Sequence, residues 1–138
     1  MEFESGPDKP LRLRVGGPCR VLLAAEAAPL LLRMGEMLRE FPGVRTVGAF
    51  RTAQEAIDWA VWDRQGWDLA FVDLGLPDGG GEELVRYLLG QPRPGEVVAL
   101  GEHLWREVRE ACAALGVRQL LEKGDLVALR DFLEQRLR

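Results

Sequence analysis

The stretch that most constrains the fold is residues 67–81, which read W-D-L-A-F-V-D-L-G-L-P-D-G-G-G. An apolar run over residues 69–72 ends at a single carboxylate, Asp73, and a loop rich in proline and glycine follows. A short apolar run between turn residues is typical of a strand buried on both faces of a sheet. An acid at the carboxyl end of such a strand points into the crevice where open α/β sheets bind ligands. From this stretch alone, a turn-capping role for Asp73 is an equally good interpretation.

Four further strand candidates share this pattern, and helical periodicity fills the segments between them. The five strand candidates are residues 20–25, 44–50, 69–72, 97–100 and 117–122. Apolar residues recur at helical spacing after the capping box of Thr52 and Glu55, and over residues 29–41, 82–89, 104–115 and 126–137. This alternation predicts an α/β fold, a doubly wound five-stranded parallel sheet with five helices. For the strand order we take 2-1-3-4-5, the flavodoxin-like order of such sheets.

The length and the composition fit one domain of this kind. The chain has 138 residues, of which 47% are hydrophobic and 29% are charged, so it can bury a substantial core. Residues 1–18 are rich in glycine, proline and charge. We therefore expect a flexible N-terminal tail over residues 1–18 and a folded domain over residues 19–138.

Charge, cysteine usage and hydropathy argue against several classes of protein. The net charge of -4 gives no electrostatic support for nucleic-acid binding. No apolar run approaches the length of a membrane span, and the polar N-terminus does not resemble a secretory signal. Cys19 and Cys112 belong to no metal-spaced cluster, so we interpret both as reduced thiols. We therefore expect a cytoplasmic protein without nucleic-acid or membrane partners.

Three charged residues, Glu26, Asp73 and Lys123, each follow a strand candidate directly. In the order 2-1-3-4-5, the strands that they follow meet around one crevice at the carboxyl edge of the sheet. Two carboxylates can hold Mg²⁺, which prefers oxygen ligands. The ammonium of Lys123 could pair with Asp73 and neutralise charge on a transferred phosphoryl group. The alternative, separate strand-end charges that meet solvent, suits any one residue better than it suits all three.

Around these residues the sequence resembles the receiver domain of bacterial two-component response regulators. The resemblance extends over about residues 19–138 and is carried by V-L-L-A-A-E (21–26), F-V-D-L-G-L-P-D-G-G-G (71–81) and L-L-E-K-G-D (120–125). It implies that Asp73 is the phosphoacceptor and that Lys123 pairs with the phosphate. It also implies a Mg²⁺ site formed by Glu26, Asp73 and the backbone carbonyl of Gly75.

The sequence departs from the receiver pattern at several positions of this site. Receivers usually carry two adjacent acids after the first strand, but Ala25 precedes Glu26 here, which implies weak Mg²⁺ binding. The Thr or Ser that usually ends the fourth strand is Gly101, and the aromatic switch residue of the fifth strand matches Leu120. The proline that commonly follows the lysine is Gly124. The fold is therefore better supported than the switch that links phosphate to surface.

His103 lies two residues after Gly101 and is the only histidine of the chain. In receivers this position and that of Gly75 tend to tune how long the phosphate lasts. A lone histidine in a loop before a helix is more often a solvated capping residue, and we prefer that interpretation.

Our functional hypothesis is a stand-alone receiver that accepts a phosphoryl group on Asp73 from a sensor histidine kinase or a phosphotransfer protein. Its own activity would be at most self-phosphorylation and autodephosphorylation. It would signal to a downstream protein by direct contact, and the resemblance suggests dimerisation through the face of the fourth helix, fifth strand and fifth helix. The main alternative is a phosphorylation-independent pseudo-receiver that acts as a protein-interaction module. A small phosphatase is disfavoured, because Gly75 stands where a second acid would be needed.

Overall fold

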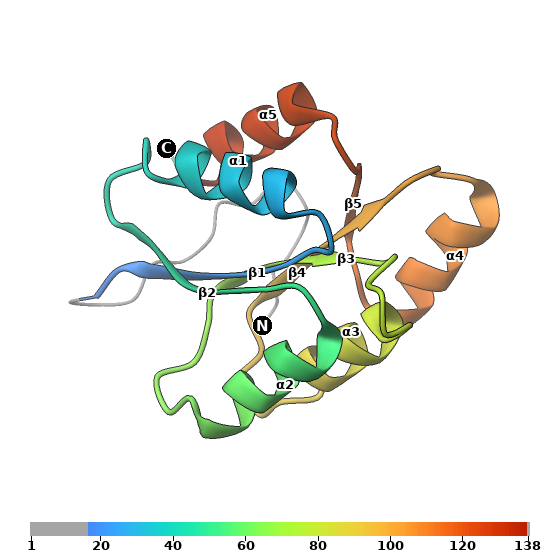
Figure 1. The fold of residues 1–138 in the computed structure, drawn as a ribbon, viewed down its shortest axis with the longest axis horizontal. Helices are drawn as coiled ribbons and strands as arrows, with labels where there is room; N and C mark the ends of the chain where they lie inside the picture. The colour runs from blue at the N-terminus through green and yellow to red at the C-terminus, as the bar shows by residue number, and fades with distance from the viewer. Residues whose placement is uncertain (1–16, 138) are drawn as a thin grey trace, which may run out of the picture.

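A computed structural model describes residues 17–137 of the chain, while residues 1–16 and 138 lie outside that description. Five strands and five helices alternate along it (Figure 1). The strands are β1 (Cys19–Ala24), β2 (Val44–Phe50), β3 (Leu69–Asp73), β4 (Glu96–Gly101) and β5 (Gln119–Glu122). The helices are α1 (Ala28–Leu38), α2 (Ala53–Trp62), α3 (Gly81–Leu89), α4 (Arg106–Leu115) and α5 (Leu126–Leu137).

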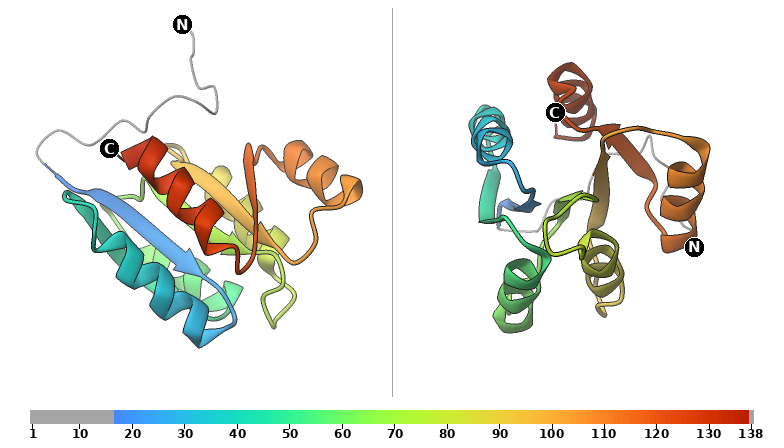
Figure 2. Two further views of the ribbon diagram at one scale, coloured as in Figure 1. Left: turned by 90° about the horizontal axis from the view of Figure 1, so that it is seen from above. Right: turned by 45° about the vertical axis from the view of Figure 1, so that its right-hand side comes forward.

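The strands form one parallel sheet in the order β2-β1-β3-β4-β5, as the sequence predicted. Helices α1 and α5 cover one face of the sheet, and α2, α3 and α4 lie on the other side (Figures 1 and 2). This is the doubly wound architecture expected from alternating strands and helices. Because all strands are parallel, their carboxyl ends meet at a single edge of the sheet.

The central strand β3 is buried along its whole length, which explains why its sequence is apolar without alternation. Its side chains divide between two separate cores. Leu69 and Phe71 pack with the residues beneath α1 and α5, and Phe71 meets Phe132 edge to face at 6.0 Å. Ala70 and Val72 pack with the residues beneath α2 and α3. The edge strand β2 is partly exposed along its length, as expected.

The first helix ends earlier than the sequence predicted. We expected it to continue to Phe41, but α1 ends at Leu38. The following turn tightens, since the N–H of Glu40 donates to Met37 and that of Phe41 donates to Leu38. This turn places the Phe41 side chain in the core beneath α1, where only 2% of it is exposed. Burial of Phe41 therefore outweighs continuation of the helical pattern.

The start of α2 confirms one half of the predicted capping box. The Thr52 hydroxyl accepts the N–H of Glu55 at 3.1 Å. The other half is wrong, because the Glu55 carboxylate accepts the N–H of Arg51 and not that of Thr52. Both carboxyl and hydroxyl still satisfy backbone donors at the point where β2 becomes α2.

The second half of the chain differs from the prediction only at the ends of its elements. The fourth helix begins at Arg106 and not at Leu104, because Trp105 has extended backbone angles. The fifth strand begins at Gln119, because Gly116 ends α4 in the left-handed conformation and the next N–H, that of Val117, bonds back to Cys112. Asp125 caps the start of α5, since its carboxylate accepts the N–H of Ala128 at 3.0 Å.

Of the expected tail over residues 1–18, all but Gly17 and Pro18 lies outside the described residues, so that prediction stays open. Both cysteines are buried and neither forms a disulfide. Within residues 17–137, no helix combines the length and the apolar character needed to cross a membrane.

Candidate functional site

Asp73 is the last residue of β3, and its side chain is among the most buried polar groups of the described chain. Its carboxylate accepts hydrogen bonds from two backbone groups: the N–H of Gly75 donates to Oδ1 at 2.8 Å, and the N–H of Glu26 donates to Oδ2 at 3.2 Å. A buried carboxylate is costly unless such donors satisfy it. The backbone on both sides of Asp73 thus holds this carboxylate in one orientation at the carboxyl edge of the sheet.

Lys123 supplies the cation that faces this carboxylate. It directly follows β5, and its N–H donates to the carbonyl of Gly101 at 2.7 Å, which continues the β4–β5 ladder by one residue. Its Nζ lies 3.2 Å from Oδ1 and 3.3 Å from Oδ2 of Asp73. The lysine side chain is 20% exposed and the aspartate side chain 1%, so the pair has one solvent-facing member. The predicted contact between Asp73 and Lys123 is therefore confirmed.

Glu26 contacts Asp73 through its backbone N–H and not through its carboxylate. Its side chain is exposed after the end of β1. Ala25, which stands where receivers usually have an acid, is 1% exposed and adds no polar group. Its N–H bonds to the carbonyl of Phe50 and so ties β1 to the end of β2. The crevice thus holds one buried carboxylate and one exposed carboxylate at its rim.

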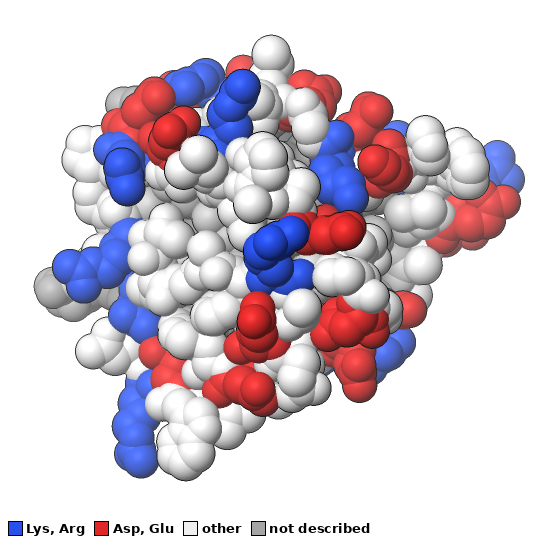
Figure 3. Space-filling view, viewed as in Figure 1, with Lys and Arg blue, Asp and Glu red and all other residues white. Residues whose placement is uncertain are grey.

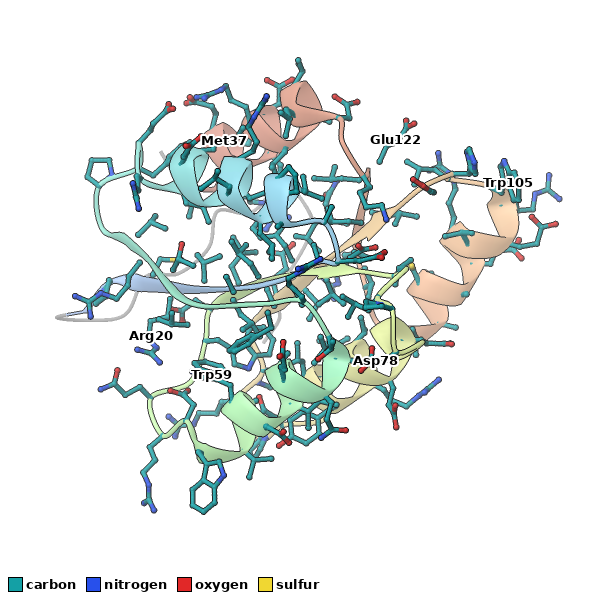
Figure 4. The ribbon with its side chains drawn as sticks, in the orientation of Figure 1. Arg20, Met37, Trp59, Asp78, Trp105 and Glu122 are labelled. Atoms are coloured by element: carbon teal, nitrogen blue, oxygen red, sulfur yellow. The ribbon has the colours of Figure 1, made fainter. Side chains whose placement is uncertain are left out.

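The loop after β3 is fastened to the start of α2. The Asp78 carboxylate accepts the N–H groups of Ala53 and Gln54, at 3.2 and 3.1 Å. The hydrogen bond from the Ala53 N–H is the main cause that lowers the pKa of Asp78 from its usual 3.8, and that from Gln54 adds to it. Such a carboxylate also complements the positive N-terminal end of the helix. Asp78 lies at this end of α2 in Figure 4.

Two glycines of this loop are required by packing. A Cβ at Gly80 would lie 2.6 Å from the Cβ of Ala53, and a Cβ at Gly81 would lie 2.7 Å from the carbonyl oxygen of Asp73. Real side chains do not approach so closely. Close packing therefore explains Gly80 and Gly81, whereas Gly79 has open space around it and a positive φ of 70° that glycine adopts without strain.

Gly101 contacts the site through its backbone alone, since its carbonyl accepts the N–H of Lys123 at 2.7 Å, and Leu120 offers no polar side chain. A Cβ at Gly101 would have ordinary contacts, 3.5 Å to Leu104 and 3.7 Å to Leu120. Leu120 is half-buried and packs against the core beneath α2 and α3. A Cβ at position 101 therefore has room.

His103 is exposed and lies near the start of α4. Its ring stacks on the Trp105 ring with centroids 5.1 Å apart and planes 8° apart. The N-cap of α4 is Trp105, which makes no side-chain cap, so the capping role that we preferred for His103 is wrong. Trp105 is 64% exposed, and Figure 4 shows it at the outer end of α4. His103 and Trp105 thus form an exposed stacked pair beside the carboxyl edge of the sheet.

Sequence reasoning missed Arg51, the residue that follows β2. Its Nε donates to the backbone carbonyl of Glu26 at 2.8 Å. The N–H of the same Glu26 donates to Asp73, so one residue connects the guanidinium to the buried carboxylate. In the space-filling view of Figure 3, basic and acidic side chains touch near the middle of the face, where the loops after β1 and β2 lie. An arginine directly after a strand candidate was a signal available in the sequence.

A second polar group lies at the opposite end of the sheet. The guanidinium of Arg20 donates to Asp63, Gln65 and the carbonyl of Gly66, at distances of 2.6–2.7 Å. A surface hollow close by is lined by residues 58, 59 and 62–65. Figure 4 shows Arg20 and Trp59 on the side of the molecule away from Asp78 and Glu122. This hollow is therefore separate from the Asp73 site.

The comparison with known families identifies the chain. The family described as "Response regulator receiver domain" matches residues 21–134. The chain belongs to this family. It is thus a receiver domain of the two-component response regulator type, and the resemblance that the sequence suggested is confirmed.

Solved structures of other receivers have the same fold. A CheY-like receiver domain from Methylobacillus flagellatus is 25% identical, with 86% of this chain and 98% of that chain covered and a TM-score of 0.65. The response regulatory domain of protein mrkE from Klebsiella pneumoniae is 14% identical, with 84% and 93% covered and a TM-score of 0.73. CheY in a CheX–CheY–BeF3–Mg complex from Borrelia burgdorferi is 14% identical, with 84% and 88% covered and a TM-score of 0.72. No curated protein matches the chain.

This receiver has fewer acidic residues at its site than receivers usually have, since Ala25 precedes Glu26. Among residues 17–137, no three His, Cys, Asp or Glu side chains lie together as a metal-binding set. The oxygen donors at the crevice are the carboxylates of Asp73 and Glu26 and nearby backbone carbonyls, which are ligands of the kind that Mg²⁺ prefers. Both Asp73 oxygens already accept N–H hydrogen bonds. This donor set fits a loosely held Mg²⁺ ion that keeps most of its water.

Proposed function

We propose that Asp73 of this receiver accepts a phosphoryl group from a phosphohistidine of a sensor kinase or a phosphotransfer protein. An Asp73 oxygen attacks phosphorus, the phosphorus–nitrogen bond to the donor histidine breaks, and the histidine leaves with the bonding electron pair. The product is an aspartyl phosphate, which water hydrolyses slowly. The observation that carries this proposal is a buried carboxylate, held in place by two backbone N–H groups, that faces the ammonium of Lys123.

The residues of the site divide the work of phosphoryl transfer between them. Such transfer needs chiefly positioning and stabilisation of charge. The N–H groups of Glu26 and Gly75 orient the attacking carboxylate, and the Lys123 ammonium can move from Asp73 to a phosphoryl oxygen as negative charge arrives. Bound Mg²⁺ would add charge neutralisation, held by the carboxylates of Asp73 and Glu26 and the carbonyl of Gly75. We propose that it binds weakly, because Ala25 offers no carboxylate.

The test is intact-mass spectrometry after incubation with acetyl phosphate and Mg²⁺. The wild-type chain should gain a phosphoryl-sized mass. Asp73→Asn should gain none, and Asp131→Asn, an equal change at an exposed position of α5, should behave as wild type. If no mass gain occurs even with a phosphorylated histidine donor, the proposal is wrong. A gain that persists in Asp73→Asn would move the acceptor to another residue.

The second candidate function is a protein-interaction module of the cytoplasm that does not depend on phosphorylation. Gly101 and Leu120 favour it, because neither offers the hydroxyl or the aromatic group through which receivers usually pass on the state of their phosphate. Under either function the partner is a protein. For dimerisation, the face of α4, β5 and α5 stays our proposed surface, with Trp105 at one end of α4.

A further inference from the structure

Arg51 is held near Asp73 by a specific hydrogen bond to Glu26. Its Nε donates to the carbonyl of Glu26 at 2.8 Å, and Glu26 lies directly between the arginine and the buried carboxylate. The arginine side chain is exposed, and among residues 17–137 its two terminal nitrogens donate to no protein group. The guanidinium is therefore anchored at its middle, while its outer donors stay available to a ligand.

The charge of Arg51 is not neutralised by a contact ion pair. Within the described part of the chain, no carboxylate forms a salt bridge with it. Two acidic residues contact Arg51 without pairing with its guanidinium charge. The Glu55 carboxylate accepts the backbone N–H of Arg51. Glu26 accepts the Nε–H through its backbone carbonyl, and its carboxylate is exposed. Two cations thus lie near one buried carboxylate: Lys123 contacts Asp73 directly, and Arg51 is connected to it through Glu26.

This balance of charge differs from that of a strong metal site. Two acids beside the acceptor favour a divalent cation, whereas a guanidinium disfavours one and favours an anion. Here the position of the second acid is Ala25, which is apolar and buried, and Arg51 lies close to it, since Ala25 bonds to the last residue of β2. A guanidinium also has the fork geometry that binds phosphate oxygens in pairs.

We propose that Arg51 is a phosphate-binding residue of this receiver, and that with Lys123 it holds the phosphoryl group transferred to Asp73. This inference rests on the proposed transfer to Asp73. Its consequence is that transfer depends only weakly on Mg²⁺, because two side chains supply positive charge that a tightly bound metal would otherwise supply.

The experiment compares phosphorylation by acetyl phosphate with EDTA and with Mg²⁺, followed by intact mass. The wild-type phosphorylation rates with EDTA and with Mg²⁺ should differ by less than about tenfold. A tenfold ratio corresponds to the free energy of about one charge-assisted hydrogen bond. Arg51→Gln should lose about tenfold or more with EDTA and less with Mg²⁺. Arg51→Lys keeps the charge without the Nε anchor or the fork, so its EDTA rate should lie between those of Arg51→Gln and the wild type. Arg45→Gln is the matched control, because it removes the same charge from an exposed position at the other end of β2.

A second readout does not depend on transfer. Inorganic phosphate, titrated with EDTA present, should shift the amide NMR signal of Gly75 in the wild type and in Arg45→Gln, and about tenfold more phosphate should be needed in Arg51→Gln. A mass gain that requires Mg²⁺, with equal phosphate binding by wild type and Arg51→Gln, would overturn the role of Arg51 and leave the proposed function intact. No mass gain in either condition would overturn both.

Discussion

Replacing Lys123 by methionine should destabilise the domain, because it leaves a buried carboxylate without its cation. Methionine keeps most of the volume and length of the side chain and removes the charge. The Asp73 side chain is 1% exposed, so water cannot take the place of the ammonium without some opening of the crevice. The carboxylate would retain only the N–H groups of Gly75 and Glu26.

The expected loss follows from the contact distances. At 3.2 Å and an effective dielectric constant of about 20, the direct attraction between the two charges is about 5 kcal/mol. Breaking a buried pair by removing one partner typically costs about 3–5 kcal/mol. The two backbone donors that remain reduce this figure, so we expect Lys123→Met to lower the free energy of unfolding by about 2–3 kcal/mol. Asp73→Asn removes the buried charge and should change stability by less than about 1 kcal/mol.

Urea denaturation followed by far-UV circular dichroism measures these changes, provided that the slope of free energy against urea is the same in every variant. When Lys123→Met is introduced into Asp73→Asn, it should lower the free energy of unfolding by about 1.5 kcal/mol less, or a still larger amount less, than it does in the wild type. This difference is the coupling free energy between Asp73 and Lys123. Arg130→Met is the control, because it breaks the exposed pair with Glu40 and should have a much smaller effect. A loss below about 0.5 kcal/mol in Lys123→Met, or strict additivity in the double variant, would refute this reasoning.

Three further predictions concern packing and pH. Gly101→Ala should raise the free energy of unfolding by about 0.5–1 kcal/mol in urea titrations, since its Cβ meets only ordinary contacts in a strand; a loss would contradict this. Gly81→Ala should lower it by about 1–3 kcal/mol because of backbone clashes, whereas Gly35→Ala, in a helix with nothing within 4 Å, should raise it by about 1 kcal/mol. Asp78→Ala should lower the melting temperature at neutral pH. Because its folded-state pKa lies below 3.8, this difference should persist above that pH and vanish as the pH falls through the folded-state value; a pH-independent difference would refute the charge argument.

The order of elements could be predicted from the sequence because each element has a distinct pattern. The apolar run of β3 reflects burial on both faces, and the end of α4 at Gly116 reflects a left-handed residue that glycine adopts without strain. The errors lie at element ends, where packing decides. Phe41 continues the helical pattern of α1 in sequence, yet its side chain reaches the core only if the chain turns after Leu38.

The candidate site could be predicted in part, for a topological reason. Asp73 and Lys123 follow strands that lie near each other, so their meeting depends only on strand order. Contacts that run through the backbone could not be predicted in this way. Arg51 binds a carbonyl, and Asp78 binds the first amides of α2, so neither has a partner that the sequence identifies by residue type. The sequence analysis placed Asp78 only within the loop after β3 and did not detect that its carboxylate links this loop to α2.

The glycines around the site separate into those that the fold requires and one that it does not. Gly80 and Gly81 have no room for a Cβ, so close packing against Ala53 and against the backbone of Asp73 is sufficient to explain them. Gly101 has room for one, which would meet Leu104, Leu120 and the carbonyl oxygen of His103 at ordinary distances. Packing therefore does not account for the missing hydroxyl beside Asp73. The difference between this domain and the usual receiver pattern lies in the chemistry of its site, where the charge carried by Arg51 and Lys123 is the feature to test.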